Sequence, residues 1–221
     1  MLRYKCLVLD HDDTVVQSEA TVNYPCFCEY LKIYRPGQTM TLEEYVGDCN
    51  RMSFLDMCQQ RFQLTDAEMD EEYRFWKAYA KTHVPAPFPG MKEFLQAYRN
   101  AGGILIVSTM SAEEMILRDY QTHFGFTPDL IFGCDLPEEM RKPGTYALEQ
   151  TTKTYGLTTE DILVIDDMKA AVSMASSGGC SIAFAGWGRK DYPGIFAEMS
   201  NLCDYTFCSI DEMAHFILGA N

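Results

Sequence analysis

The sequence has no apolar run that approaches the ~20 residues a membrane-spanning helix needs. Met1 leads directly into the first expected strand, which leaves no room for a signal peptide. We therefore expect a soluble, cytoplasmic protein. Internal repeats and low-complexity segments are also absent, and 47% hydrophobic and 13% aromatic residues allow the 221-residue chain to bury a full core. A disordered chain is thereby excluded.

Basic residues are scarce, since 18 lysines and arginines stand against 32 aspartates and glutamates, for a net charge of −14. This charge argues against nucleic acid or an anionic membrane surface as a partner. It does not argue against a small anionic substrate, because a divalent cation and a few lysines or arginines can reverse the field inside one pocket.

The nine cysteines lack the pattern of a disulfide framework or a zinc site. Their number is odd, they are spread from Cys6 to Cys208, and several fall in apolar runs. Cys26 and Cys28 are the only close pair, with no further ligand at suitable spacing nearby. We predict free thiols in a reducing compartment.

The apolar stretch Cys6-Leu7-Val8-Leu9 predicts a buried strand that ends at two acids, Asp10 and Asp12. Further strands are expected near 104–107, 130–132, 162–165 and 181–184, and helices near 90–100, after Ser111, after Pro143, near 169–177 and after Ser209. Apolar strands that alternate with helices indicate a parallel sheet covered on both faces. We predict an α/β fold with a Rossmann-like, doubly wound parallel sheet.

Residues 16–85 interrupt this alternation and carry helical signals only. Thr41 and Thr65 each open a capping box, and Pro25 marks a break or late start in an earlier helix. One aromatic stripe predicts the buried face of a helix and consists of Met69, Tyr73, Trp76 and Tyr79. Alternating prolines between 85 and 89 suit a stiff return. We predict a core domain of residues 1–15 and 86–221 and an inserted all-helical domain of residues 16–85.

Polar groups follow the strands at the edge where a doubly wound sheet binds ligands. They are Asp10 and Asp12, Ser108 and Thr109, and the pair Asp166-Asp167. A further group, Lys142, stands beside Pro143 at the start of an expected helix, from which its side chain could turn back toward the same edge. Simpler interpretations exist, because hydroxyls and acids often start helices and most lysines are solvated. Acids clustered at the end of a buried strand are harder to explain without a cation, since their charges repel. The pattern indicates phosphoryl transfer or a metal site.

The chain resembles the haloacid dehalogenase superfamily, because it contains that family's four motifs in order. They are a strand followed by Asp-x-Asp-x-Thr, a strand followed by Ser, a Lys-Pro pair, and a strand followed by Asp-Asp. The resemblance covers essentially the whole chain and implies that residues 16–85 form a type 1 helical cap. Phe88-Pro89-Gly90-Met91 resembles the segment by which that family re-enters its core. The last motif has two adjacent acids, and Ala171 stands where many relatives have another aspartate. In this respect the motif is similar to that of the β-phosphoglucomutase and phosphoglycolate phosphatase branch.

The resemblance implies a role for each strand-end group. Asp10 would be the nucleophile that forms an aspartyl-phosphate, and Asp12 the general acid and then the base that activates water. Thr14 would steady the loop. Phosphoryl oxygens would be held by Ser108, Thr109 and Lys142. Mg²⁺ would be held by Asp10, the backbone carbonyl of Asp12, Asp167 and, directly or through water, Asp166.

Substrate choice is expected to lie with the cap. Residues 46–51 resemble a cap loop that contributes to specificity in relatives, and Arg51 there suits a second phosphate or a carboxylate, with a solvated surface arginine as the equal alternative. Trp187 and Arg189 are weaker candidates for lining the entrance. His11 departs from the apolar residue common between the two acids, and we expect it to pack locally or face solvent.

Together these features favour an Mg²⁺-dependent phosphatase that acts on a small phosphorylated metabolite, as a monomer or weak homo-oligomer. The alternative is a β-phosphoglucomutase-like sugar-phosphate mutase, which would return the phosphoryl group to the substrate. A non-catalytic phosphate-binding protein or a receiver-like signalling module is a remote alternative, because receiver modules are shorter and have no helical insert.

Overall fold

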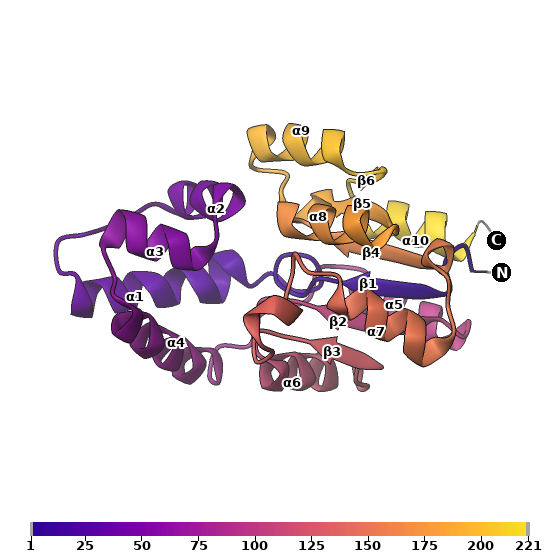
Figure 1. The fold of residues 1–221 in the computed structure, drawn as a ribbon, viewed down its shortest axis with the longest axis horizontal. Helices are drawn as coiled ribbons and strands as arrows, with labels where there is room; N and C mark the ends of the chain where they lie inside the picture. Colours follow the sequence, from indigo (N-terminus) through magenta and orange to yellow (C-terminus); the bar gives the residue numbers. More distant parts are fainter. Residues whose placement is uncertain (1, 220–221) are drawn as a thin grey trace. The chain divides into compact units, whose positions relative to one another are not determined.

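The computed structural model describes residues 2–219, in which the chain forms two compact units (Figure 1). One unit contains the first strand, up to Val16, and the chain from Ala86 onward, and the other comprises Gln17–Pro85. Val16 lies with the first unit because isolated bridges pair it with Asp12 and Pro87. The sequence alone places Val16 at the start of the helical insert.

A parallel sheet forms the centre of the first unit, with six strands among the described residues in the order β3-β2-β1-β4-β5-β6. The strands are β1 (Cys6–Leu9), β2 (Ile104–Ser108), β3 (Leu130–Phe132), β4 (Ile162–Asp166), β5 (Ser181–Ala185) and β6 (Tyr205–Phe207). After β3 the chain crosses to the other side of β1. The carboxyl ends of β1 and β4 therefore flank the switch point where such sheets bind ligands, and the predicted fold class is confirmed.

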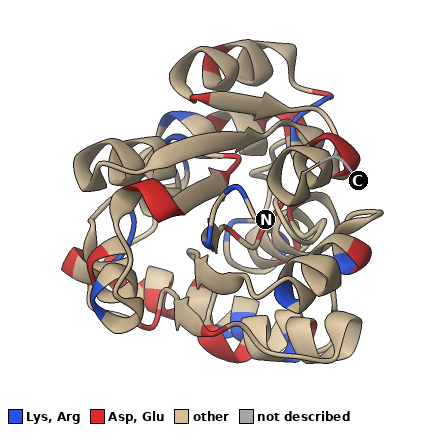
Figure 2. Cartoon of the chain, turned by 90° about the vertical axis from the view of Figure 1, so that its right-hand side faces the viewer, with Lys and Arg blue, Asp and Glu red and all other residues tan. Residues whose placement is uncertain are grey.

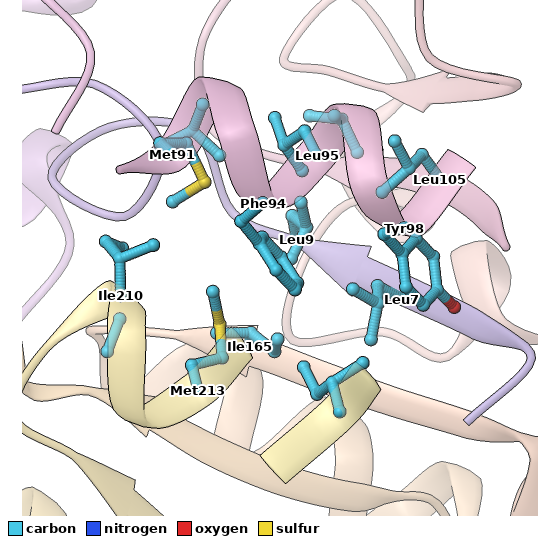
Figure 3. Close-up of a cluster of buried hydrophobic side chains, with 14 of the residues drawn as sticks. Leu7, Leu9, Met91, Phe94, Leu95, Tyr98, Leu105, Ile165, Ile210 and Met213 are labelled. Atoms are coloured by element: carbon cyan, nitrogen blue, oxygen red, sulfur yellow. The ribbon is translucent and has the colours of Figure 1, made fainter. Parts of the chain in front are cut away.

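Helices cover both faces of this sheet. On one face, α5 (Met91–Asn100) and α10 (Ile210–Leu218) pack with Leu7 and Leu9 (Figure 3). Buried residues of α6 (Glu113–Phe124) belong to the same core. On the other, α7 (Tyr146–Tyr155) and α8 (Lys169–Gly178) pack with Cys6 and Val8. Successive strand residues point to opposite faces, so a strand covered on both sides is continuously apolar.

Two elements of the first unit were not expected from the sequence, α9 (Pro193–Leu202) and β6. The Pro193-Gly194 pair that begins α9 is typical of a turn. β6 is a three-residue edge strand like β3, but it has the polar Thr206 at its centre and so lacks the continuous apolar run that reveals β3.

The second unit is helical throughout. It contains a π-helical turn (Glu19–Asn23), α1 (Tyr24–Tyr34), α2 (Leu42–Arg51), α3 (Phe54–Phe62) and α4 (Asp66–Ala80). Both predicted capping boxes are present, at Thr41 and Thr65. Residues 46–51 lie inside α2, so the loop expected there is wrong, because the helix begun at the Thr41 cap continues through Gly47 to Arg51.

The predicted buried face of α4 is also wrong. Tyr73 is exposed and the other aromatic residues of the stripe are half-buried, whereas Glu72 and Ala80 are buried. The Tyr73 ring stacks on Trp76, and Trp76 Nε1 donates to Asn23 Oδ1 at 2.9 Å. Amphipathic rings can thus lie along the edge of a helix interface, with their polar tips bonded, instead of filling its centre.

Glu72 places a carboxyl group in the interior of this helical unit. It is 5% exposed, and burial raises its pKa from 4.5 to about 7. Because the folded-state pKa lies above the unfolded one, ionisation costs stability. The cost is absent below about pH 4, where both states bind the proton, grows as the pH rises, and is complete above pH 7.

We therefore expect Glu72→Gln to raise the free energy of unfolding by roughly 3 kcal/mol at pH 8 and by much less at pH 5. Urea unfolding at the two pH values measures the difference. The exposed Glu43 on α2 provides a matched control, because Glu43→Gln changes a side chain at the surface and should change the free energy of unfolding by no more than about 0.5 kcal/mol. An equal effect of Glu72→Gln at both pH values would contradict the assignment.

Acidic residues lie on many helices and loops of the chain, with lysines and arginines between them (Figure 2). The net charge is therefore not gathered in one segment. None of the helices within residues 2–219 is long and apolar enough to cross a bilayer. All nine cysteines fall in the described range and are free thiols. The cytoplasmic location stays a prediction.

Candidate active site

Three buried aspartates meet at the carboxyl ends of β1 and β4. Asp10 follows β1, Asp166 ends β4 and Asp167 follows it, and one carboxylate oxygen from each lies within 4.8 Å of the others. The strand register explains the meeting, because Leu9 pairs with Ile165 and the next residue of each strand must therefore lie side by side. The structure brings together the two most widely separated of the predicted motifs.

Lys142 bridges two of these acids. Its Nζ donates to Asp10 Oδ1 at 2.7 Å and to Asp166 Oδ2 at 2.6 Å, and its side chain is 4% exposed. The simpler interpretation, a solvated surface lysine, is therefore excluded. Burial disfavours the ammonium form, but the charges of Asp10 and Asp166 outweigh burial and raise the pKa of Lys142, so it stays protonated.

Burial raises the pKa of an acid, whereas it lowers the pKa of a lysine. It raises the pKa of Asp10 well above its usual range, and the neighbouring acids Asp166 and Asp167 add to the shift while Lys142 opposes it. The pKa of Asp166 is raised for the same reasons. Added positive charge beside these carboxyls would favour their ionised forms.

Asp167 is held from two distant parts of the chain. Thr14 Oγ1 donates to Asp167 Oδ1 at 3.3 Å, and Arg189 Nη2 lies 2.5 Å from Asp167 Oδ2. The other end of the guanidinium, Nη1, lies 3.3 Å from Asp13 Oδ2. Thr14 thus contacts the acid cluster, and its role in steadying the loop stays a prediction.

The predicted entrance positions of Trp187 and Arg189 are wrong, because both residues are buried. Trp187 Nε1 donates to the carbonyl oxygen of Thr14 at 3.0 Å. Gly188 permits this close approach, since a Cβ there would lie 2.1 Å from the carbonyl oxygen of Asp13. A glycine-rich segment after a strand is typical of an exposed turn, and only the packing of that turn on the Asp13 loop reveals Arg189 as a site residue.

Asp12 lies on the loop after β1 and is half-buried. Its Oδ2 accepts a hydrogen bond from Ser111 Oγ at 2.5 Å. The helix that the sequence predicts after Ser111 is present as α6, but Ser111 does not cap it. The N-cap of α6 is Ala112, and Asp135 Oδ2 takes over the capping role by accepting from the Glu113 amide at 2.8 Å.

Ser108 and Thr109 are buried at the end of β2. The Ser108 hydroxyl contacts Met174 Sδ at 3.9 Å, and Thr109 Oγ1 accepts from the amide of Ser111 at 3.2 Å. Neither hydroxyl caps α6, so the simpler interpretation of these residues fails. Their binding of phosphoryl oxygens stays a prediction.

Arg51 belongs to the helical unit, where its side chain is 63% exposed and pairs with Asp48. Asp48 also forms an ion pair with Arg61, whose Nη1 lies 2.9 Å from Asp48 Oδ2. Asp48 is buried and thus fixes two arginines at the end of α2 and in α3. A role for Arg51 in substrate choice stays a prediction.

The acid cluster has an excess of negative charge. Within residues 2–219, its buried carboxylates are Asp10, Asp13, Asp166 and Asp167, and its buried cations are Lys142 and Arg189. With all six groups ionised, two negative charges are left over, which equals the charge of one divalent cation. Buried charges without compensation cost several kcal/mol each, so the donor set and the charge both suit such an ion.

Comparison with known proteins gives one family. The model of the haloacid dehalogenase-like hydrolase family matches residues 7–185, a range that includes every strand-end motif. No curated protein sequence matches the chain.

Solved structures with the same fold cover nearly the whole chain. A haloacid dehalogenase-like family hydrolase from Streptococcus pneumoniae is 18% identical, with a TM-score of 0.73 over 97% of this chain and 99% of its own. A predicted phosphoglycolate phosphatase from Haemophilus somnus is also 18% identical, with a TM-score of 0.73 over 96% and 99%. CbbY from Rhodobacter sphaeroides, solved in complex with phosphate, is 16% identical, with a TM-score of 0.73 over 95% and 96%.

At such identities these structures establish the fold, whereas the family model covers most of the chain's length and all of its motifs. The resemblance seen in the sequence is confirmed. The chain belongs to the haloacid dehalogenase-like hydrolase family.

Proposed function

We propose that this protein is an Mg²⁺-dependent phosphatase that hydrolyses a small phosphorylated metabolite through an aspartyl-phosphate on Asp10. The observation that carries the proposal is the buried cluster of Asp10, Asp166 and Asp167 bridged by Lys142 at the switch point of the sheet. The similarity to a predicted phosphoglycolate phosphatase and to CbbY in complex with phosphate supports a phosphorylated substrate.

The residues of the cluster fit a magnesium ion. Mg²⁺ selects oxygen ligands and is usually held by a few carboxylates together with water and substrate phosphate. Asp10, Asp166 and Asp167, with the carbonyl of Asp12, would hold it. Bound there, the ion would supply positive charge against the phosphoryl oxygens and would favour the ionised form of Asp10.

The chain's own residues account for the phosphoryl transfer. A carboxylate oxygen of Asp10 attacks phosphorus while the bond from phosphorus to the leaving oxygen breaks, and Asp12 gives that oxygen its proton. Lys142 has three N–H donors, two of which bind Asp10 and Asp166, and the third is available to a phosphoryl oxygen. Asp12 then takes a proton from the water that attacks the aspartyl-phosphate, which releases phosphate and restores Asp10.

The two alternatives differ from this proposal in specific ways. A mutase would pass the phosphoryl group from Asp10 to a sugar hydroxyl instead of water. Membership of a hydrolase family argues against a silent binding protein or a receiver-like module. We retain the helical unit as a cap, Arg51 as a residue that recognises a second anion, and the monomeric or weakly oligomeric state as parts of the proposal.

The test is release of inorganic phosphate from a panel of small phosphomonoesters. We expect turnover of one or a few metabolites with Mg²⁺, a loss of about 10²-fold or more after chelation with EDTA, and recovery when Mg²⁺ is returned. Turnover that needs a hexose phosphate together with a bisphosphate activator would indicate the mutase. Failure to release phosphate from any monoester, with no acyl phosphate formed on the protein, would refute the proposal.

A further inference from the structure

His11 stands between Asp10 and Asp12, and its side chain is buried on the sheet face covered by α6. His11 is 1% exposed, and its Nε2 shares a hydrogen bond of 3.0 Å with Asp119 Oδ2 on α6. Its ring lies 5.9 Å from the ring of Tyr120, a member of the core on that face. The expectation that His11 could face solvent is therefore wrong.

The partner of His11 is itself held in place. Arg118 Nε donates to Asp119 Oδ1 at 2.7 Å, so both carboxylate oxygens of Asp119 are bound. Asp119 is 2% exposed. An apolar side chain would fill the place of His11 without burying a polar pair, and buried polar pairs stabilise a fold weakly or not at all compared with apolar ones. Packing alone does not account for this pair.

The same residue organises the loop that carries Asp12. The backbone carbonyl of His11 accepts from the amides of Val15 at 2.9 Å and Val16 at 3.1 Å, which closes a turn over Asp12 and Asp13. Asp13 has a φ of 52°, in the left-handed region, so the turn is tight. A shift of His11 would therefore move the whole turn.

The loop is attached to one helix at two points. His11 binds Asp119 within α6, and Asp12 accepts from Ser111 in the segment that leads into α6. The first contact fixes the backbone of the turn and the second fixes the Asp12 carboxyl. Both must persist if the carboxyl is to keep one position.

We propose that the His11–Asp119 pair is a positioning device that fixes the Asp12 loop on α6 and so keeps the Asp12 carboxyl where it can donate a proton to the leaving group. The inference rests on the proposed function. His11 and Asp119 are positioning residues, since neither is assigned a contact with the reacting atoms.

Proton donation matters most when the leaving group is poor. Departure of an alkoxide needs the proton from Asp12, whereas departure of dinitrophenolate does not, and general acids contribute about 10²–10⁴-fold where they are needed. In His11→Phe an apolar ring fills the space of the imidazole. We expect this variant to lose kcat/KM for an alkyl phosphate by a factor at least about 10 times larger than the factor by which it loses kcat/KM for dinitrophenyl phosphate. Asp119→Leu should do the same.

Three further variants complete the experiment. Asp12→Asn defines the full signature of a lost proton donor. Asp119→Asn keeps an oxygen acceptor for His11 Nε2. Its ratio of kcat/KM for the alkyl phosphate to kcat/KM for dinitrophenyl phosphate should therefore stay close to that of the wild-type protein. Phe124 is buried on the same helix, and its ring contacts the rings of Tyr120 and Phe126. Phe124→Leu should therefore lower the Tm and reduce kcat/KM for both substrates by the same factor. Equal losses on both substrates in His11→Phe, in step with its Tm, would overturn the inference.

Hydrogen exchange separates failure of this inference from failure of the proposed function. The Val15 and Val16 amides bind the His11 carbonyl, so their exchange should become at least about 10-fold faster in His11→Phe and stay unchanged in Phe124→Leu. If the wild-type protein hydrolyses no phosphomonoester, the proposed function fails and exchange alone decides whether the pair holds the loop. Unchanged exchange in His11→Phe would overturn the positioning role in either case.

Discussion

Replacement of Asp10 by asparagine is expected to reduce phosphate release by at least about 10³-fold while the fold is retained. The amide has nearly the same shape as the carboxyl but cannot attack phosphorus to form an acyl phosphate. The change also removes one of three acids that repel one another, and Lys142 keeps Asp166 as a partner at 2.6 Å. The free energy of unfolding should therefore not fall.

Two measurements and one control make the Asp10 result decisive. Acid quench during turnover, followed by mass spectrometry, should find the phosphoryl group on the Asp10 peptide of the wild-type protein and none on the variant. Asp161→Asn changes an acid that pairs with Lys5 just before β4, away from the cluster, and should leave turnover intact. Undiminished turnover in a folded Asp10→Asn protein would remove Asp10 as the nucleophile.

Replacement of Lys142 by methionine is expected to lower both stability and activity. Methionine keeps the length of the side chain but leaves Asp10 and Asp166 buried without their shared cation, and loss of one partner from a buried ion pair costs about 3–5 kcal/mol. Phosphate release should fall at least about 10²-fold, because no ammonium group is left to bind a phosphoryl oxygen. Urea unfolding in the presence of EDTA measures the stability without a contribution from bound metal.

Lys5 provides a matched comparison for Lys142. Its Nζ lies 2.8 Å from Asp161, nearly the distance found in the Lys142 pairs, but its side chain is 68% exposed. Such surface pairs contribute about 0–1 kcal/mol, so Lys5→Met should be almost neutral. The double variant Lys142→Met with Asp166→Asn should regain part of the lost stability and none of the activity. A loss in Lys142→Met no larger than that in Lys5→Met would show that the buried ion pairs do not support the fold.

The acid cluster connects these two predictions. Lys142 and Arg189 compensate part of the charge of four buried aspartates, and the remaining charge suits one divalent cation. Under the proposed function, this excess of buried negative charge costs stability and serves to bind Mg²⁺ beside a phosphorylated substrate. Residues that bind the catalytic loop, such as His11 and Ser111, then decide how accurately Asp12 is placed.

The sequence by itself determined the sheet, the interruption by helices and the strand-end groups. A strand buried on both faces must be continuously apolar, and the first polar residue after it lies at the ligand edge. These are local properties of short segments, so Asp10, Ser108 and Asp166 could be placed at that edge without coordinates, whereas Lys142 follows no strand and was singled out only by the order of all the motifs. The family resemblance, which depends on the order of the same groups, was visible for the same reason.

Only the tertiary structure decided which side chains meet. Arg189 in the cluster, Ser111 on Asp12 and Asp119 on His11 are contacts between segments far apart in the chain, and no periodicity or spacing encodes them. The exposed Tyr73 and the buried Glu72 of α4 illustrate the same limit, because burial on a helix depends on the neighbours that cover each face as well as on its own pattern.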